Sequence, residues 1–448
     1  MLRVHPASGQ SKPHLITVME YWLFEPPERW TPEQENRWWE EIYQPPPAFE
    51  RVLETPRWVI LSGPPLSGKT MLLQALKRHF AKKALVLPGE EFISPGNDQD
   101  FLFRLTRTVS WRIRSQLAEQ PEKIKELSRT QRQYLRWAIE KFHRPRAFFV
   151  WLDGLPKESA ACFKDIEYQD LYPTQTDPYD IHVQMEELGN LCGALQLEKI
   201  VITFDIPFFS SIRELEQLDA TLSRLELLQH PAIQGIVALP ERFATPERLR
   251  LPRDRATRIP LRPDQEHIRT IVERYLQHAT NGQVKHFTDL CNAQLLDALQ
   301  DMLTAEFTPH SLGAHIQLAG TLLSLLHREN ISIEALPLSM EWLSSIRSAF
   351  YQEHCPLRLE NAQNTAGVWR GYRWIPLKQS NLEFMEHLKK GQTVTPHMFG
   401  GSAANLNTLA KRLRDAIEPD PSHPTYIINQ RGEGYYIANF RSSPSDEF

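Results

Sequence analysis

The sequence is poor in cysteine and glycine, and it contains no long apolar run. Only four cysteines occur in 448 residues, Cys162, Cys192, Cys291 and Cys355, and no two of them form a CxxC pair. This spacing argues against a disulfide framework and a structural zinc site, and it favours a reducing, cytoplasmic location. No run approaches the roughly 18 apolar residues of a membrane span. The N-terminal residues also lack the apolar region of a signal peptide.

An excess of charge of either sign is also missing. The chain has 51 basic and 55 acidic residues, a net charge of −4. Any DNA-binding surface must therefore be local, because the chain as a whole is not basic. A hydrophobic content of 41% and a charged content of 24% are typical of a globular protein.

Hydrophobic periodicity divides the chain into several parts. We expect an N-terminal arm at 1–49, an α/β core at 50–262, a helical lid at 263–345, a linker at 346–368, a C-terminal module at 369–440 and a tail at 441–448. In the core, apolar runs at 58–62, 84–88, 199–205, 235–239 and 258–261 alternate with helical patterns. This predicts a five-stranded, mostly parallel sheet with covering helices. Single helices are expected at 122–143 and 284–304.

The arm is rich in tryptophan and proline. The segment 31–43 predicts a short helix with Thr31 as its N-cap and Gln34 at the capping-box position. Two interpretations remain open. The aromatic side chains pack on the next domain, or the arm docks a protein partner.

Residues 63–70 form the pattern GxxxxGKT between an apolar strand and a helix. Such a loop turns its N–H groups around phosphate oxygens, and the following helix N-terminus adds partial positive charge. We expect Lys69 to reach the β- and γ-phosphates of ATP and Thr70 to hold Mg²⁺. The expected nucleotide-binding residues are Gly63, Pro64, Pro65, Leu66, Ser67, Gly68, Lys69, Thr70 and Met71.

A second acid should hold Mg²⁺ at the end of a neighbouring strand. Asp205 ends the unbroken β-branched run 199–205 and is favoured. Asp153 is the alternative, although the apolar residues of 147–155 recur at helical intervals. Ile206 and Gly154 follow these aspartates, where many hydrolytic relatives place a glutamate. Hydrolysis is therefore expected to be slow, or to use another acid, or the nucleotide acts as a switch ligand.

Arginines follow the fourth expected strand: Arg242, Arg248, Arg250, Arg253, Arg255 and Arg258. Arg242 lies just past that strand, where a γ-phosphate sensor or an arginine finger would sit. The alternative is a solvated basic loop.

With these residues placed, segment 50–330 resembles the AAA+/STAND class of P-loop ATPases. The resemblance rests on GPPLSGKT, the five-strand pattern, the strand ending in Asp205 and RIPLRPDQEHIRTIVERYL at 258–276. It implies an α/β P-loop NTPase fold with a helical lid, which uses ATP and Mg²⁺ to control self-assembly into a homo-oligomer.

The C-terminal module contains an amphipathic helix at 402–420. Its apolar stripe comprises Leu406, Leu409, Ala410, Leu413 and Ile417. The opposite face carries Asn405, Asn407, Thr408, Lys411 and Arg412, which suit base-edge and phosphate contacts in a major groove. Two strands around Arg431-Gly432-Glu433-Gly434 then predict a hairpin.

This module resembles the winged-helix DNA-binding domain of OmpR-type response regulators, on KRLRDAIEPDPSHPTYIINQRGEGYYI at 411–437. The resemblance places Asn405, Thr408, Lys411 and Arg412 toward the groove and Arg431 on the wing, near the minor groove or a phosphate. The module has nine basic and six acidic residues. A single copy should therefore bind double-stranded DNA weakly. A winged helix used for protein contact is the alternative.

Together these motifs predict an ATP-binding DNA-binding regulator whose nucleotide state controls assembly and DNA binding. One alternative is an ATPase assembly factor of a bacterial defence or DNA-transposition system, with the winged helix used for targeting or docking. A second alternative is a signalling scaffold that keeps its nucleotide as a structural ligand.

Overall fold

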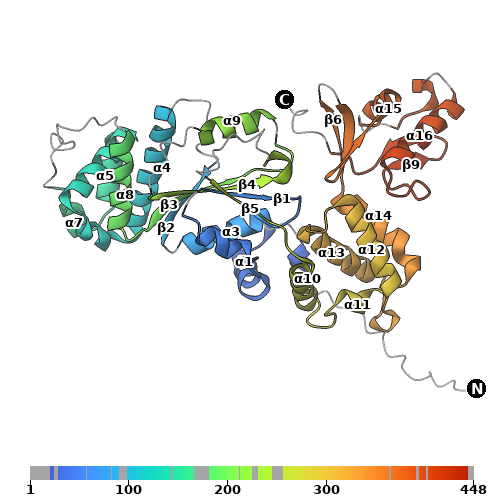
Figure 1. Cartoon of the computed structure of the whole chain (residues 1–448), viewed down its shortest axis with the longest axis horizontal. Helices are drawn as coiled ribbons and strands as arrows, with labels where there is room; N and C mark the ends of the chain where they lie inside the picture. The colour runs from blue at the N-terminus through green and yellow to red at the C-terminus, as the bar shows by residue number, and fades with distance from the viewer. Residues whose placement is uncertain are drawn as a thin grey trace, which may run out of the picture. The chain divides into compact units, whose positions relative to one another are not determined.

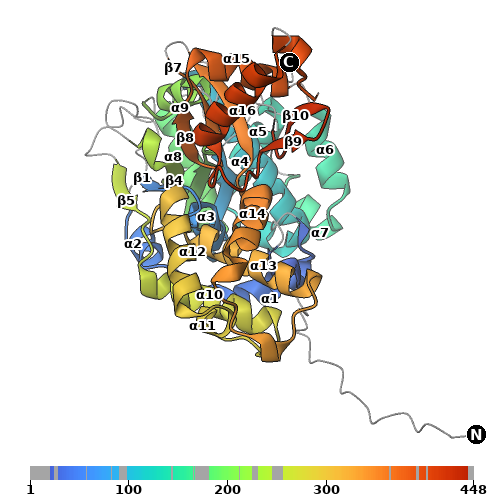
Figure 2. The same cartoon turned by 90° about the vertical axis from the view of Figure 1, so that its right-hand side faces the viewer.

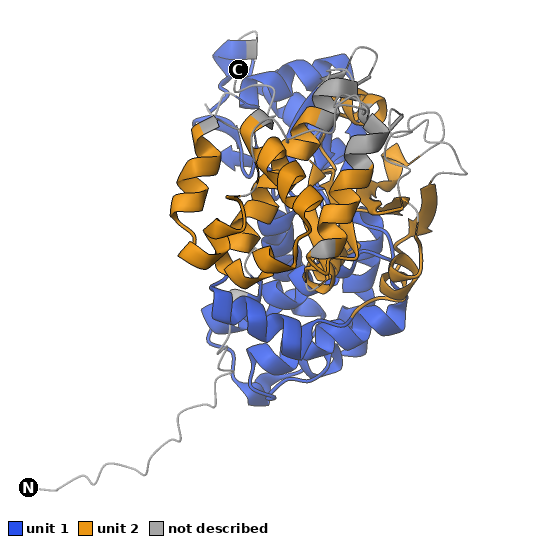
Figure 3. Cartoon of the chain, turned by 90° about the vertical axis from the view of Figure 1, so that its left-hand side faces the viewer, with its two compact units in different colours: residues 1–44, 263–448 blue, residues 45–262 orange. Residues whose placement is uncertain are grey.

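The computed structural model describes the chain in two compact units, which Figure 3 colours separately. Unit 1 comprises Met1–Gln44 and Pro263–Phe448, and unit 2 comprises Pro45–Arg262. The described residues are 21–24, 29–56, 58–81, 83–89, 98–142, 145–164, 166, 181–210, 212–223, 231–244, 256–362, 365–389, 393–399 and 402–441. Arg248, Arg250, Arg253, Arg255 and most of the expected tail lie outside them. None of the helices in these ranges is long and apolar enough to cross a membrane.

Unit 2 is built on a five-stranded parallel sheet, as predicted. Its strands are β1 (Trp58–Gly63), β2 (Ala84–Pro88), β3 (Lys199–Asp205), β4 (Ile233–Pro240) and β5 (Ala256–Pro260). The strand order is β2-β3-β4-β1-β5, with every neighbouring pair parallel. Figure 1 labels these five strands. The strand that precedes the GxxxxGKT loop therefore lies between β4 and β5.

Helices cover both faces of this sheet because its strands are apolar on both faces. Val59 and Leu61 of β1 belong to one core, with buried side chains of α2 (Ala48–Leu53) and α3 (Lys69–Phe80). Trp58 and Ile60 alternate with them and belong to the opposite core. That second core also takes side chains from α4 (Asp98–Glu119), α5 (Arg129–Phe142), α6 (Pro145–Asp153), α8 (Ile181–Ala194) and α9 (Ile212–Ser223).

The single helix expected over 122–143 is interrupted. A 3₁₀-helix, η5 (Pro121–Glu126), ends at extended Leu127, and α5 begins at Arg129. The backbone N–H of Gln131 donates to the Ser128 hydroxyl (3.2 Å), and the backbone N–H of Ser128 donates to the Gln131 side chain (2.8 Å). This reciprocal cap starts a new helix. A short helix, α7 (Lys157–Ala161), follows α6.

The central part of unit 1 is a helical bundle. It comprises α10 (Gln265–Ala279), α11 (Phe287–Leu290), α12 (Ala293–Glu306), α13 (Leu312–Arg328) and α14 (Leu343–His354), with 3₁₀ turns η9 (Ile333–Ala335) and η10 (Met340–Trp342). The helix expected over 284–304 is two helices, because Asn292 caps α12 by accepting from the N–H of Leu295 (2.9 Å).

The described part of the N-terminal arm packs on this bundle. It consists of η1 (Tyr21–Phe24), α1 (Pro32–Arg37) and the π-helix η3 (Trp38–Ile42). Residues 45–49, expected as the end of the arm, belong instead to unit 2, where α2 begins at Ala48. Thr31 and Gln34 form the predicted capping box. The buried Trp38 donates from Nε1 to the Tyr275 hydroxyl on α10 (2.7 Å). The arm thus packs on helices more than 200 residues further along the chain.

The C-terminal part of unit 1 begins with a three-stranded antiparallel sheet of β6 (Leu357–Ala362), β7 (Thr365–Arg370) and β8 (Arg373–Pro376). It continues with α15 (Gln379–Lys389), η11 (Pro396–Phe399), α16 (Ala403–Ile417) and a hairpin of β9 (Ile427–Gln430) and β10 (Gly434–Ile437). Figure 2 labels α15, α16, β9 and β10. The segment 346–368, expected as a linker, thus contains most of α14, all of β6 and most of β7.

Candidate functional site

The GxxxxGKT loop connects β1 to α3 in a tightly constrained path. Gly63 ends β1, and a Cβ there would lie 2.7 Å from both the Leu261 carbonyl oxygen and the Ser67 Oγ. Gly68 adopts a left-handed conformation (φ 91°) immediately before α3. Leu66 is also left-handed (φ 60°), which is uncommon for a residue with a side chain. The two glycines are therefore required by space at Gly63 and by backbone conformation at Gly68.

The Lys69 side chain folds back over this loop. Its Nζ donates to the carbonyl oxygens of Gly63 (2.9 Å) and Pro64 (2.7 Å), and it lies 3.4 Å from the Ser67 Oγ. Burial lowers the pKa of Lys69 to about 8, while the negative charges of Asp205 and Glu241 oppose that shift. At neutral pH the group is thus a partly desolvated cation at the start of α3, a suitable partner for phosphate oxygens.

Asp205 lies at the same edge of the sheet as this loop. It is the last residue of β3 and pairs with Ala238 of β4, while Gly63 pairs with Pro240 of β4. Since parallel strands end at one edge, β3 and β1 bring Asp205 and the loop to the two sides of β4. Its effect on the pKa of Lys69 is consistent with this proximity.

Asp153 has a different setting. It is the exposed last residue of α6, and helix 145–153 confirms the helical interpretation of its apolar residues. The strand end that motivated Asp153 as an alternative magnesium ligand is therefore absent.

The Arg242 side chain is half-buried between aromatic rings just after β4. Its guanidinium carbon lies 4.1 Å from the centre of the Phe208 ring and 4.3 Å from that of Phe243. It also donates to the Phe208 carbonyl oxygen. These contacts hold the Arg242 side chain against Phe208, in the loop that follows β3. The role of Arg242 as a γ-phosphate sensor stays a prediction.

Glu241 was missed by the sequence analysis, although it directly precedes Arg242. It opens the 3₁₀ turn η8 (Glu241–Phe243) after β4, is exposed, and forms an ion pair with Arg262. Its position directly after an apolar strand could have indicated that Glu241 lies near the phosphate loop, but only Arg242 was predicted from that position. Among the described residues, no group of three or more His, Cys, Asp or Glu side chains is arranged to hold a metal ion by itself.

In unit 1, the predicted DNA-contacting residues lie on exposed positions of α16 and of the β9–β10 hairpin. The exposed residues are Asn405, Asn407, Thr408, Lys411, Arg412 and Arg431. Two of them already have partners within the module. Asn407 accepts from the Tyr435 hydroxyl (3.0 Å), and the Thr408 hydroxyl donates to the Ala404 carbonyl oxygen (2.8 Å). Asn405, Lys411 and Arg412 are therefore better candidates for DNA contacts than Asn407 and Thr408, whose side chains already form hydrogen bonds within the module.

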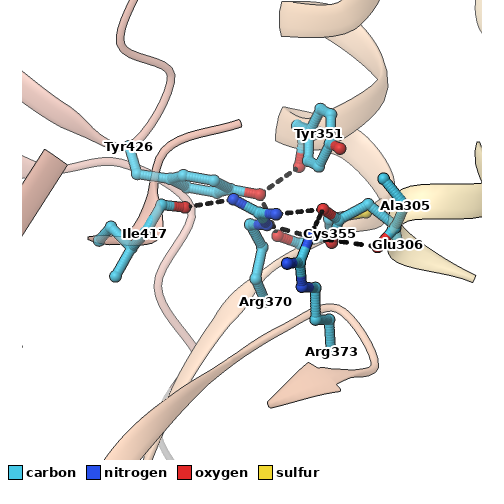
Figure 4. A network of polar contacts seen from close by, with 8 residues as sticks. All are labelled: Ala305, Glu306, Tyr351, Cys355, Arg370, Arg373, Ile417 and Tyr426. Atoms are coloured by element: carbon cyan, nitrogen blue, oxygen red, sulfur yellow. Dashed lines mark hydrogen bonds and ion pairs between the residues drawn. The ribbon is translucent and has the colours of Figure 1, made fainter. Parts of the chain in front are cut away.

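The end of α16 is fixed by a buried polar network, drawn in Figure 4. Arg370 of β7 donates to the carbonyl oxygen of Ile417, the last residue of α16 (2.6 Å). Tyr426 donates from its hydroxyl to the Cys355 carbonyl oxygen (2.6 Å), just after α14. Hydrogen bonds therefore connect the end of α16 to the strand β7, and the residue before β9 to the end of the bundle.

No family model matches the chain. Among solved structures, it is similar to the Orc1 protein of Aeropyrum pernix in complex with DNA, with 12% identity over 87% of each chain and a TM-score of 0.36. It is also similar to Cdc6p of Pyrobaculum aerophilum, with 12% identity over 83% of this chain and 97% of that one and a TM-score of 0.22. The strand order and the loop after β1 themselves define unit 2 as an α/β P-loop fold.

Proposed function

We propose that the chain is an ATP-binding, DNA-binding regulator in which the nucleotide state controls assembly and DNA binding. The observation that carries this proposal is the Lys69 ammonium, held on the carbonyl oxygens of a glycine-constrained loop at a helix N-terminus. Phosphate oxygens of ATP would replace those carbonyl oxygens as its partners. This loop and the exposed polar face of α16 occur on one chain, as a nucleotide-dependent DNA-binding regulator requires.

The same residues fit a magnesium ion bound with the nucleotide. Thr70 is exposed at the second position of α3, and Asp205 is half-buried at the end of β3. A threonine hydroxyl and a carboxylate provide the oxygen ligands that Mg²⁺ prefers. The ion would neutralise phosphate charge, with Thr70 as a ligand and Asp205 as a ligand directly or through water. Lys69 would bind the phosphates beside it.

The C-terminal part of unit 1 is proposed to be a winged helix of the OmpR type. In support, a three-stranded sheet precedes α15 and α16, and a hairpin with Arg431 at its turn follows them. Asn405, Lys411 and Arg412 on α16 would face the major groove, and Arg431 would contact the minor groove or a phosphate. Its small charge excess favours several copies acting together, so we propose that the ATP-bound protein is a homo-oligomer.

DNA binding measured in each nucleotide state tests the proposal. Fluorescence anisotropy with a mixed-sequence duplex would be recorded at two salt concentrations without nucleotide, with ADP, and with a non-hydrolysable ATP analogue. We expect the analogue to tighten binding, and Lys69→Ala to remove that effect while leaving nucleotide-independent binding unchanged. Lys77→Ala, a lysine on the same helix, is the matched control.

Two results would overturn the proposal. If DNA affinity is the same in every nucleotide state, the two parts of the chain are uncoupled. If no DNA binds at either salt concentration, the C-terminal module serves another purpose. Exposed Met398 (46%) and Tyr436 (37%) on this module favour protein docking as that second function, as in an ATPase assembly factor.

A further inference from the structure

Hydrolysis of ATP is accelerated by a group that positions the attacking water or accepts its proton, and the position after Asp205 offers none. Ile206 occupies that position, is buried, and donates from its backbone N–H to the Ala238 carbonyl oxygen (3.0 Å). The side chain after the magnesium-binding acid is therefore part of the apolar core. A general base for ATP hydrolysis would therefore be a side chain after a different strand at this edge of the sheet.

Glu241 follows the strand that lies between β1 and β3. Because Gly63 pairs with Pro240, the next residue, Glu241, lies beside the beginning of the phosphate loop. Asp205 pairs with Ala238 on the other side of β4. The two carboxylates thus follow two adjacent strands, β3 and β4, on the same side of the loop, and both charges act on the Lys69 ammonium.

Arg262 forms an ion pair with Glu241 at the carboxyl end of β1, the strand that precedes the phosphate loop. Arg262 comes two residues after β5, and Leu261 before it donates from its N–H to the Ser62 carbonyl oxygen of β1 (2.7 Å). Since β1 lies between β4 and β5, the Glu241–Arg262 ion pair passes over the carboxyl end of β1. The ion pair thus holds the carboxylate at this edge of the sheet while it stays open to water, with its side chain 46% exposed.

We infer that Glu241 is the general base for ATP hydrolysis and that Arg262 is its positioning residue. This inference rests on the proposed ATP binding at Lys69. In the step, the oxygen of a water molecule forms a bond to the γ-phosphorus, and the bond from that phosphorus to the β,γ-bridging oxygen breaks. ADP leaves with the electron pair of that bond. Glu241 accepts the proton from the water and then releases it to solvent.

The test measures ATP binding and ATP turnover separately in the full chain. The dissociation constant would be measured by titrating the protein with a fluorescent ATP analogue in the presence of Mg²⁺. Steady-state hydrolysis of ATP would give kcat and KM. We expect Glu241→Gln to lower kcat by about 100-fold or more, the usual contribution of a general base, with the dissociation constant of ATP within about threefold. Glu241→Asp should restore part of kcat.

Arg262→Gln should lower kcat by about tenfold without raising KM, and Arg262→Lys should restore part of it, because the ammonium keeps the charge but not the planar fork. The matched control is Glu158→Gln. Glu158 also pairs with a cation in unit 2, Lys125 (2.7 Å), but lies on α7 with its side chain 81% exposed. Its substitution should leave kcat and KM unchanged.

The outcomes separate this inference from the proposed function. If the unsubstituted protein fails to bind ATP, the proposed function itself is wrong. If it binds ATP but shows no turnover, or if Glu241→Gln hydrolyses ATP at the original rate, the role of Glu241 is overturned while ATP-dependent regulation stands. An equal loss of ATP binding and turnover in Glu241→Gln would also overturn it, because a base acts on the chemical step.

Discussion

Arg370 and Glu306 form a buried ion pair between the strand β7 and the last residue of α12 (Figure 4). The Arg370 Nε donates to the Glu306 Oε2 (3.1 Å), and its Nη2 donates to Oε1. Only 5% and 2% of the two side chains are exposed. Because Arg370 also binds the end of α16, the pair links the bundle to the helix proposed to contact DNA.

Removing one member of this pair should destabilise the protein strongly. Glu306→Gln or Arg370→Met leaves a buried charge without its partner, and we expect the free energy of unfolding to fall by about 3–5 kcal/mol. Urea unfolding at constant pH measures the change. Arg373→Met is the matched control, because Arg373 contacts the same carboxylate (3.3 Å) with its side chain 49% exposed. Its cost should stay below about 1 kcal/mol.

Substitution of Gly63 should damage the phosphate loop. A Cβ at this position meets the Leu261 carbonyl oxygen and the Ser67 Oγ at 2.7 Å, so Gly63→Ala must displace the loop or β5. We expect a loss of about 1–3 kcal/mol in stability and at least tenfold weaker ATP binding, about 1.4 kcal/mol. Isothermal calorimetry and thermal unfolding report the two effects.

Gly193→Ala provides the contrast to that substitution. Gly193 lies in α8, and nothing lies within 4 Å of a Cβ built there. Alanine should therefore stabilise the helix by about 0.5–1 kcal/mol. A Gly63→Ala protein as stable as Gly193→Ala, with normal ATP affinity, would contradict the steric argument.

Charge removal on the exposed face of α16 should weaken DNA binding at every sequence. Lys411→Ala and Arg412→Ala should each reduce the slope of log K against log salt concentration by about 1, if each side chain contacts a phosphate. Anisotropy titrations between low and moderate salt measure the slope. Arg328→Ala, an exposed arginine of α13, removes the same charge from the bundle and should leave the slope unchanged.

His354 should make the protein less stable in mild acid. Burial lowers the pKa of His354 to about 4, although Glu353 lies 3.6 Å away, and its Nε2 lies 3.1 Å from the Thr321 hydroxyl on α13. Since the unfolded chain binds a proton near pH 6.5 and the folded chain does not, stability falls as the pH drops from about 6.5 to about 4, by up to about 3 kcal/mol.

Urea unfolding at several pH values measures this dependence. His354→Gln should flatten the curve between these limits, because glutamine does not titrate. A slope that persists in His354→Gln would place its origin elsewhere.

Local patterns predicted most elements of the fold. The five strands, the loop before α3 and the amphipathic α16 lie where alternating or periodic apolar residues placed them. The errors fell where local caps interrupt one apolar pattern, as at Ser128 and Asn292. The strands β6 and β7 were missed in 346–368, because short antiparallel strands with mixed side chains give little periodic signal.

The sequence by itself determined the phosphate loop, since GxxxxGKT between a strand and a helix leaves few other conformations. It also determined the exposed polar face of α16, which follows from a 3.6-residue period. Only the tertiary structure decided between Asp205 and Asp153 as a strand-end acid, brought Glu241 to the loop and joined Glu306 to Arg370. These relationships depend on strand order and on contacts between distant segments, which a local pattern of residues does not specify.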